Sequence, residues 1–378
     1  MPDPRFLQIH TLSPYTAALL NRDDSGLAKR LPFGGVMRTR VSSQCLKRHW
    51  RMADDPLAIE RIDGSAGAHR SRELVTKLVI DKLRESVPEA DLKLIDEAFQ
   101  KAVYGDKGTS KASRQTLLLG APEIAWLKTQ AEALAKPGDG DNRPLNDRLA
   151  AWAKELKANA KAMRASASLP GGLAGALFGR LVTSDPDANI TAPVHVAHAF
   201  TVHAEETESD YFTAVDDLAD PEDTGADTIQ ETELTSGLFY GYVVVDIGGL
   251  VDNLGADIAL AGAVLNSLVH LIAEVSPGAK LGSTAPYGRA SFMLLEAGDR
   301  QPRSLAEAYR APVNPQVDAA VARLGEHLGR VDACYATGEA RRVMSLTPVE
   351  IPGATGGSLS ELAAWAAALP GKGRTAVS

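Results

Sequence analysis

The succession of strand-like and helix-like segments constrains this chain more than any other feature. Alternating apolar residues predict strands, and apolar residues three or four apart predict helices. Both patterns occur outside two long interruptions. The predicted segments are strands at 6–12 and 36–41, a helix from Ser42 to about Met52, strands at 194–203 and 238–247, a helix at 256–275, a strand at 290–295, and helices at 315–336 and 359–369.

The two interruptions differ in character. The first is a block of helical patterns at 71–87, 88–104, 121–136 and 145–164. The second, at 205–233, lies between two predicted strands and holds twelve acidic residues and no lysine or arginine. We therefore interpret the first as a helical subdomain and the second as an arm.

Without these insertions the chain reads strand, helix, strand, strand, helix, strand. This is the order of a ferredoxin-like or RRM-like fold. The sequence therefore predicts an α+β protein, in which a ferredoxin-like core carries a helical insertion and a β-rich arm.

The charge of the chain is unevenly distributed. Its 40 Lys and Arg against 48 Asp and Glu give a net charge of −8, which by itself disfavours nucleic acid as a partner. Outside 205–233, however, the balance is +4, and residues 22–51 hold eight basic side chains against two acidic ones. The region 22–51 is therefore a candidate surface for nucleic acid.

Composition narrows the class of protein further. Among 378 residues there are two cysteines, and there is no signal sequence or long apolar span, so a reduced, cytoplasmic protein without a membrane partner is expected. No nucleotide-binding loop of the ATPase or dehydrogenase kind occurs. The Gly-rich loop at 277–288, which includes Lys280, is weak evidence for a segment lying along a sugar-phosphate backbone.

The helix that begins at Ser42 carries the strongest signal for nucleic-acid binding. One face collects Gln44, Lys47, Arg48 and Arg51, and the opposite face holds Leu46 and Trp50. The hydroxyls of Ser42 and Ser43, with unpaired backbone N–H groups at the helix start, suit a phosphate. Arg22 and Lys29 lie upstream, near a Gly34-Gly35 loop that would let the backbone approach a ligand. An ordinary solvated helix face is the alternative.

A second basic face lies on the predicted helix at 145–164. It consists of Lys154, Lys157, Lys161 and Arg164. A solvated helix surface and a groove for duplex phosphates are both consistent with this spacing. The second interpretation predicts contact with DNA.

Two kinds of chemistry remain as weaker alternatives. His195, His198 and His203 are close in sequence, but on a strand the first and last would lie about 27 Å apart, so no metal site or cofactor is expected. Cys45 and His49 are four residues apart on one helix and could form a thiol nucleophile with its base. A structural thiol is the alternative, and Cys45→Ala would test it.

Five separated motifs, in one order, resemble the CasC/Cse4 family, the crRNA-binding backbone subunits of the type I-E CRISPR Cascade complex. They lie at 21–48 (with NRDD, FGG and RVSSQCLKR), 179–184, 210–218, 236–242 and 274–280. The resemblance covers the chain from end to end. It implies an RRM-like (RAMP) palm with helical fingers and a thumb. The implied parts are palm at 1–60, fingers at 61–180, a palm strand at 181–204, thumb at 205–235, and palm with C-terminal helices at 236–378.

The resemblance also implies a function. Copies of the chain would form a helical filament along one crRNA, and each thumb would displace one nucleotide while the other guide bases stay available for target DNA. Further Cascade subunits and a recruited nuclease-helicase would be the other partners, in antiviral defence. The chain itself would have no catalytic residues and no cofactor.

Individual residues can be matched to the family's motifs. The resemblance places Arg22, Lys29, Ser42, Gln44, Lys47 and Arg51 at the RNA backbone, and Leu181, Phe212 and Thr213 at the displaced base. Two positions depart from the family: Leu181 stands where the family can carry methionine, and Cys45 where serine or alanine is usual. An apolar wedge and a small helix residue are kept in both cases.

Two questions remain for the acidic arm. We hypothesise that its charges contact the basic palm of the next copy, and that reversing Glu222, Asp223 and Asp227 weakens assembly. The rival function is a metal-dependent RNA endonuclease, because related type III subunits cleave RNA with a thumb aspartate. Asp210 or Asp216 would then be the candidate.

Overall fold

The computed structural model describes residues 4–136, 141–155, 169, 171–182, 185–214 and 228–371. The chain divides into two compact units. Unit 1 comprises Met1–Ala58, His195–Ile247 and Gly262–Ser378, and unit 2 comprises Ile59–Val194 and Gly248–Ala261.

A large sheet forms the centre of unit 1. In the described part of the chain its strand order is β12-β11-β10-β1-β9-β7-β3-β2, and β6 and β8 also pair with β9. The strands are β1 (Phe6–Ala18), β2 (Arg30–Phe33), β3 (Val36–Val41), β6 (Val194–Val196), β7 (Ala199–Thr201), β8 (Glu206–Ala214), β9 (Thr228–Asp246), β10 (Phe292–Gly298), β11 (Ala340–Ser345) and β12 (Ala354–Gly356). Along this order and in the β8–β9 pair the strands are antiparallel, except that β11 and β12 are parallel.

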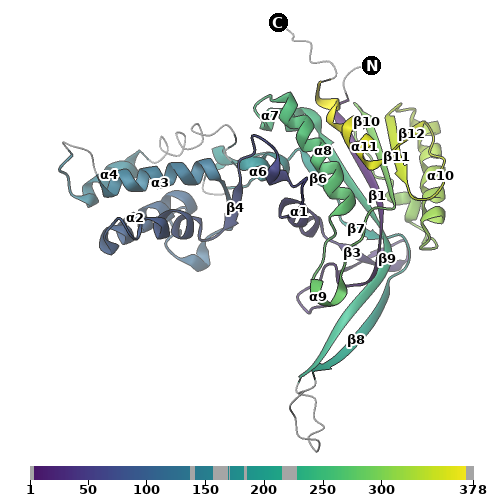
Figure 1. Ribbon diagram of the computed structural model, residues 1–378, viewed down its shortest axis with the longest axis horizontal. Helices are drawn as coiled ribbons and strands as arrows, with labels where there is room; N and C mark the ends of the chain where they lie inside the picture. The colour runs from purple at the N-terminus through teal and green to yellow at the C-terminus, as the bar shows by residue number, and fades with distance from the viewer. Residues whose placement is uncertain are drawn as a thin grey trace, which may run out of the picture. The chain divides into compact units, whose positions relative to one another are not determined.

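Helices cover both faces of this sheet. Residues 6–12 of β1 are all buried, as expected for a central strand with apolar layers on each side. Helices α1 (Ser43–Arg51) and α8 (Ile258–Glu274) pack on one face, and η6 (Ala306–Tyr309) and α10 (Val317–Tyr335) pack on the other. In Figure 1, α8 and α11 (Leu359–Ala367) cross in front of the strands, and α10 lies beside β11 and β12.

The arm is an extension of the sheet. Strand β9 is 19 residues long, and its C-terminal half pairs with β1 from Leu12↔Tyr240 to Phe6↔Asp246. Its N-terminal half pairs with β8 from Glu206↔Ser236 to Ala214↔Thr228. The two strands leave the sheet as a hairpin (Figure 1), so the arm is continuous with a core strand.

Unit 2 is mainly helical. Its elements are η1 (Ile59–Arg61), β4 (Ala68–Ser71), the π-helical η2 (Thr76–Ile80), η3 (Asp81–Leu83), α2 (Glu89–Tyr104), η4 (Lys111–Ser113), β5 (Leu117–Gly120), α3 (Ala121–Ala135), α4 (Leu145–Lys154), α6 (Gly172–Phe178) and η5 (Pro186–Ala188). Phe99 of α2 stacks on Trp152 of α4 with ring centroids 4.5 Å apart, inside a cluster of buried apolar residues. Helix α7 (Ile247–Asn253) also lies in unit 2 from Gly248 onward, and the short α9 (Leu281–Thr284) and η7 (Leu369–Gly371) belong to unit 1.

The coarse fold agrees with the prediction of mixed α and β structure, and two segments differ from it. The helix predicted at 71–87 is shortened and irregular, because Ala68–Ser71 pairs with β5 and ends only at Ser71. The strand predicted at 194–203 is divided into β6 and β7 by a break at Ala197 and His198. In both cases long-range pairing decides the outcome.

Within the described residues, no single helix is long and apolar enough to cross a membrane, and only the bent pair α7 and α8 meets the length and composition test.

Candidate nucleic-acid interface

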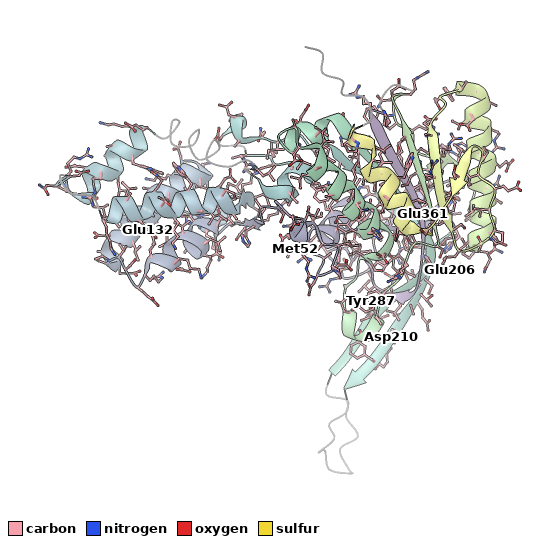
Figure 2. The ribbon with its side chains drawn as sticks, turned by 45° about the horizontal axis from the view of Figure 1, so that its top comes forward. Met52, Glu132, Glu206, Asp210, Tyr287 and Glu361 are labelled. Carbon is pink, nitrogen blue, oxygen red and sulfur yellow. The ribbon has the colours of Figure 1, made fainter. Side chains whose placement is uncertain are left out.

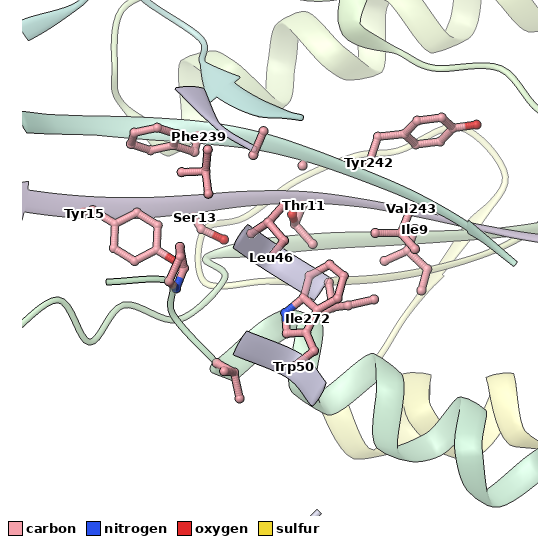
Figure 3. Close-up of a pocket in the computed structure, with 15 residues that line it drawn as sticks. Ile9, Thr11, Ser13, Tyr15, Leu46, Trp50, Phe239, Tyr242, Val243 and Ile272 are labelled. Carbon is pink, nitrogen blue, oxygen red and sulfur yellow. The ribbon is translucent and has the colours of Figure 1, made fainter. Parts of the chain in front are cut away.

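Helix α1 exposes one polar face and packs with the other. Ser42 caps the helix, since its hydroxyl accepts a hydrogen bond from the Cys45 N–H at 3.2 Å. Leu46 and Trp50 point into a small cavity of about 40 Å³ against the sheet and Ile272 (Figure 3). On the other side Gln44 and Arg48 are exposed, and Lys47 and Arg51 are half-buried. The amphipathic pattern predicted for this helix is therefore confirmed.

The first turn of α1 is already occupied by the protein. The Ser42 N–H donates to Oδ1 of Asn21 at 2.9 Å, and the Ser43 N–H donates to Nδ1 of His198 at 3.1 Å. Ser42 and Ser43 are both buried. The expectation of unpaired N–H groups at this position is wrong for Ser43 and Cys45, because His198 and the Ser42 hydroxyl accept their hydrogen bonds. Whether the two serines contact RNA stays a prediction.

The loop before β2 holds Arg22 and Lys29. Asp23 closes it, because its Oδ1 accepts the N–H groups of Ser25 and Leu27 at 2.9 and 3.0 Å. Arg22 is exposed, and Lys29 is half-buried and donates its N–H to the carbonyl of Asn21. Both predicted contacts therefore lie near the start of α1.

The Gly34-Gly35 loop was predicted to let the backbone approach a ligand, but in the structure it forms a tight turn packed on Arg310. It closes the β2–β3 hairpin, with Phe33 paired to Val36 and both glycines at positive φ. A Cβ on Gly34 would lie 1.5 Å from the carbonyl oxygen of Arg310. The close approach that requires glycine is thus to the chain's own backbone.

Among the eight basic residues at 22–51, Arg38 and Arg30 hold other elements of the fold in place. Arg38 is fully buried and donates to the carbonyls of Phe33, Thr201 and Tyr309. Arg30 forms ion pairs with Glu205 and Glu233 at the base of the arm. These two arginines hold the hairpin and the arm to the sheet.

The arm brings Phe212 together with Lys280. The Lys280 ammonium lies 5.3 Å from the centre of the Phe212 ring and donates to the Thr232 hydroxyl. Phe212 is 41% exposed. The backbone of Thr213 pairs with Ile229 on the opposite strand. Three predicted contacts therefore lie on or against the arm.

A cavity of about 460 Å³ lies between the loop of Arg22 and the arm. Arg22 and Lys280 line it, together with Glu208, Glu231 and Glu233. The structure thus brings two predicted RNA contacts to one cavity, and it adds acidic groups there that the sequence did not place. Glu233 also accepts the N–H of Ala28 at 2.6 Å, which ties the loop to the arm.

Leu181 belongs to unit 2 and is 64% exposed. It lines a cavity of about 510 Å³ with Arg70 and Gln115. Its neighbour Arg180 is buried and forms an ion pair with Glu123 at 2.7 Å. An apolar side chain is therefore presented at the surface from a rigid, buried support.

The second basic face is only partly described. Lys154 ends α4 and is exposed. Lys157, Lys161 and Arg164 lie outside the described residues, as do Glu222, Asp223, Asp227 and Asp216. Their predicted roles stay predictions.

The geometry favours a structural thiol at Cys45. Its Sγ lies 3.6 Å from Nδ1 of His49, but that nitrogen donates to the Cys45 carbonyl at 2.8 Å, and Nε2 accepts the N–H of Gly278 at 3.4 Å. Burial raises the pKa of Cys45, although Arg48 and Lys29 act in the opposite direction. Both imidazole nitrogens are occupied and the thiol is neutral at pH 7.

The histidines proposed above as a weak metal candidate have separate partners. His203 accepts the N–H of Leu238 on Nε2 and donates to the Ala204 carbonyl, whereas His198 bonds to Ser43. Among the residues that the structure describes, no three His, Cys, Asp or Glu side chains are grouped to hold a metal. Asp210 is an exposed residue of β8 (Figure 2).

Tyr240 and Tyr242 pack in the fold. Tyr240 is 1% exposed, and its ring centroid lies 5.4 Å from that of Tyr309. The Tyr242 hydroxyl donates to Gln8 at 2.8 Å. Tyr240 is therefore a core residue.

Comparisons with known proteins find one matching protein family and similar chains in solved structures. The sequence model described as CT1975-like protein matches residues 7–365. A solved chain titled "CRISPR RNA-guided surveillance complex, pre-nicking" is 25% identical with a TM-score of 0.74, and the match covers 96% of this chain and 100% of that one. A chain titled "CRISPR RNA-guided surveillance complex" has the same fold at 19% identity and a TM-score of 0.58, covering 96% and 99%. A search of curated proteins gives no match.

Proposed function

The chain belongs to the CT1975-like protein family, and on this premise we propose that it is a non-catalytic RNA-binding subunit of a CRISPR surveillance complex of type I-E. Several copies would line up along one crRNA and form the backbone of the Cascade ribonucleoprotein. The match to a surveillance-complex chain over its whole length supports the coarse assignment.

One observation carries the RNA-binding part of the proposal. The polar face of α1, the loop of Arg22 and Lys29, and the arm with Phe212 and Lys280 all belong to unit 1. These candidate cations and the Phe212 ring therefore lie in one compact unit, and two of the cations, Arg22 and Lys280, line one cavity. A protein that must hold any guide sequence should grip phosphates and leave base edges free for pairing.

The arrangement of unit 1 supports a RAMP-type palm. Strands β10, β1, β9 and β7 are adjacent in that order, so the first strand along the chain lies between the last and the third. We infer from this order that the four strands correspond to a ferredoxin-like sheet with two crossing helices. In our proposal the arm of β8 and β9 is the thumb, and unit 2 provides the fingers.

The thumb would displace one nucleotide per copy. Phe212 and Leu181 offer apolar surface on which a flipped or flanking base can rest, at about 1–3 kcal/mol per stacked base. Lys154 and the basic residues that follow it would contact target DNA. The acidic tip of the thumb would meet the basic palm of the next copy, and other Cascade subunits and a nuclease-helicase would complete the assembly.

Salt dependence tests the proposal. If each copy neutralises about five phosphates, log K against log salt has a slope of about −3.5 per copy. Replacing Lys47 by methionine should reduce the slope by about 0.7, because one fewer cation is displaced. Fluorescence anisotropy with a labelled single-stranded RNA measures both.

The matched control is Lys82→Met, which removes the same charge from an exposed position in unit 2. It should leave the slope unchanged. RNA affinity that does not depend on salt, or equal slopes for Lys47→Met and the unchanged chain, would contradict the proposal.

A further inference from the structure

We propose that His198 is a further RNA contact, in which the Nε2–H group of a neutral imidazole donates a hydrogen bond to a phosphate oxygen of the bound strand. This inference rests on the proposed function and adds a residue that the motifs did not assign. His198 lies in the break between β6 and β7 and is exposed.

The hydrogen bond to Ser43 fixes the tautomer of His198. A backbone N–H can only donate, so Nδ1 must accept the Ser43 N–H and cannot itself carry a proton. The neutral ring then carries its single proton on Nε2. In the described part of the chain no protein group accepts a hydrogen bond from Nε2, so this donor is available to a ligand.

The surroundings of His198 specify an anion as that ligand. Arg40 of β3, Lys29 of the preceding loop and Lys47 of α1 are the charged groups that act on the imidazole, and all three are cations. Burial, reinforced by these cations, lowers the pKa of His198, so the ring stays neutral at pH 7. A neutral N–H group can orient a phosphate through a directional hydrogen bond. Unlike a fourth cation, it does not repel the three cations nearby.

The first turn of α1 does not supply this site. Its Ser43 and Cys45 N–H groups are taken by His198 and by the Ser42 hydroxyl. In our proposal the imidazole takes the place of the Ser43 and Cys45 N–H groups as a donor to phosphate.

Two substitutions separate the structural role of His198 from the binding role. His198→Asn keeps an oxygen that can accept the Ser43 N–H but, because its side chain is shorter, has no donor at the position of Nε2. His198→Gln reaches outward with its amide N–H but does not place an acceptor at the position of Nδ1. The full chain with each substitution would be titrated with fluorescein-labelled oligouridine at several salt concentrations and unfolded in urea.

We expect His198→Asn to unfold at the same urea concentration as the unchanged chain and to bind oligouridine about two- to tenfold more weakly, the effect of one neutral hydrogen bond. The salt slope should not change, because a neutral donor displaces no cation. His198→Gln should keep more of the affinity. Lys47→Met, in contrast, should change the slope.

Several results would overturn the assignment while leaving the proposed function intact. In the first, His198→Asn binds oligouridine as tightly as the unchanged chain does, and the unchanged chain shows the expected salt slope. Another is a defect in self-association alone, which would indicate a carboxylate of a neighbouring copy. If His198→Asn folds poorly, ¹⁵N NMR of the unchanged chain decides, since Nε2 of His198 should be protonated and shift on adding oligouridine, and the absence of that shift contradicts the inference.

Discussion

At the scale of single residues, Glu296 is the centre of a buried polar network in unit 1. It is fully buried, and its two carboxylate oxygens accept hydrogen bonds from Arg303 and Arg341 at 2.8 Å and from His10 at 3.1 Å. The Tyr240 hydroxyl lies 2.9 Å from the other nitrogen of His10. These contacts join β1, β9, β10 and β11 through side chains.

The network makes folding stability depend on pH. Burial raises the pKa of Glu296, but the hydrogen bonds from His10 and Arg303 outweigh it and hold the pKa well below its usual range. Burial lowers the pKa of His10 despite its bond to Glu296. As pH falls below 6.5 and then below 4.5 the unfolded chain therefore binds protons that the folded chain does not.

We predict that the urea midpoint falls progressively from pH 7 to pH 4. Glu296→Gln should lower the free energy of unfolding by about 3 kcal/mol at pH 7, because it removes the buried carboxylate that pairs with buried Arg341 and half-buried Arg303. Urea unfolding followed by circular dichroism measures both. A midpoint that is constant over this range, or a glutamine variant as stable as the unchanged chain, would contradict the account.

This network also shows which residue roles a sequence can reveal. His10 and Glu296 are 286 residues apart, so no local pattern links them. The two faces of α1 were predictable because their spacing lies within nine residues. Arg38 was counted with the basic surface, yet it is fully buried, since only the folded chain brings four carbonyls around it.

At the scale of elements, the β2–β3 hairpin depends on two different glycines. Both have positive φ, but a Cβ on Gly34 would meet the Arg310 carbonyl, whereas nothing lies within 4 Å of one on Gly35. Gly35→Ala should therefore lower the free energy of unfolding by only about 1–2 kcal/mol, the cost of a residue with a Cβ in the left-handed conformation.

Gly34→Ala should lower the free energy of unfolding distinctly more than Gly35→Ala, because the backbone of the hairpin or of Arg310 must move. The comparison of melting temperatures for the two variants isolates the close contact from the φ penalty. Equal melting temperatures would mean that the contact with Arg310 does not constrain the hairpin.

The elements themselves were predicted unevenly. Helices α2 and α3 and strand β3 match their expected ranges within one residue, because each carries its own apolar period. Strands β2, β4, β5, β11 and β12 were not predicted. The arm was expected to separate two strands, whereas β9 runs through both arm and sheet. Strand pairing over long distances decides these cases.

At the scale of the whole molecule, the net charge of −8 is an average over regions of opposite charge that have different roles. Glu205 and Glu233 belong to the acidic segment, yet they pair with Arg30 of the same chain. Part of the acidic charge therefore anchors the arm, whereas the charged groups that act on His198 are all cations. The family resemblance that five motifs predicted is confirmed by the CT1975-like match and by the surveillance-complex chains.

The most direct test of the central claim is to co-express the chain with a CRISPR array and its neighbouring subunits, treat the purified assembly with nuclease, and sequence the RNA that remains. We predict a protected crRNA of one defined length, bound by several copies of this chain. An assembly that purifies without RNA, or with RNA of random length, would contradict the proposal that this chain forms the RNA-binding backbone.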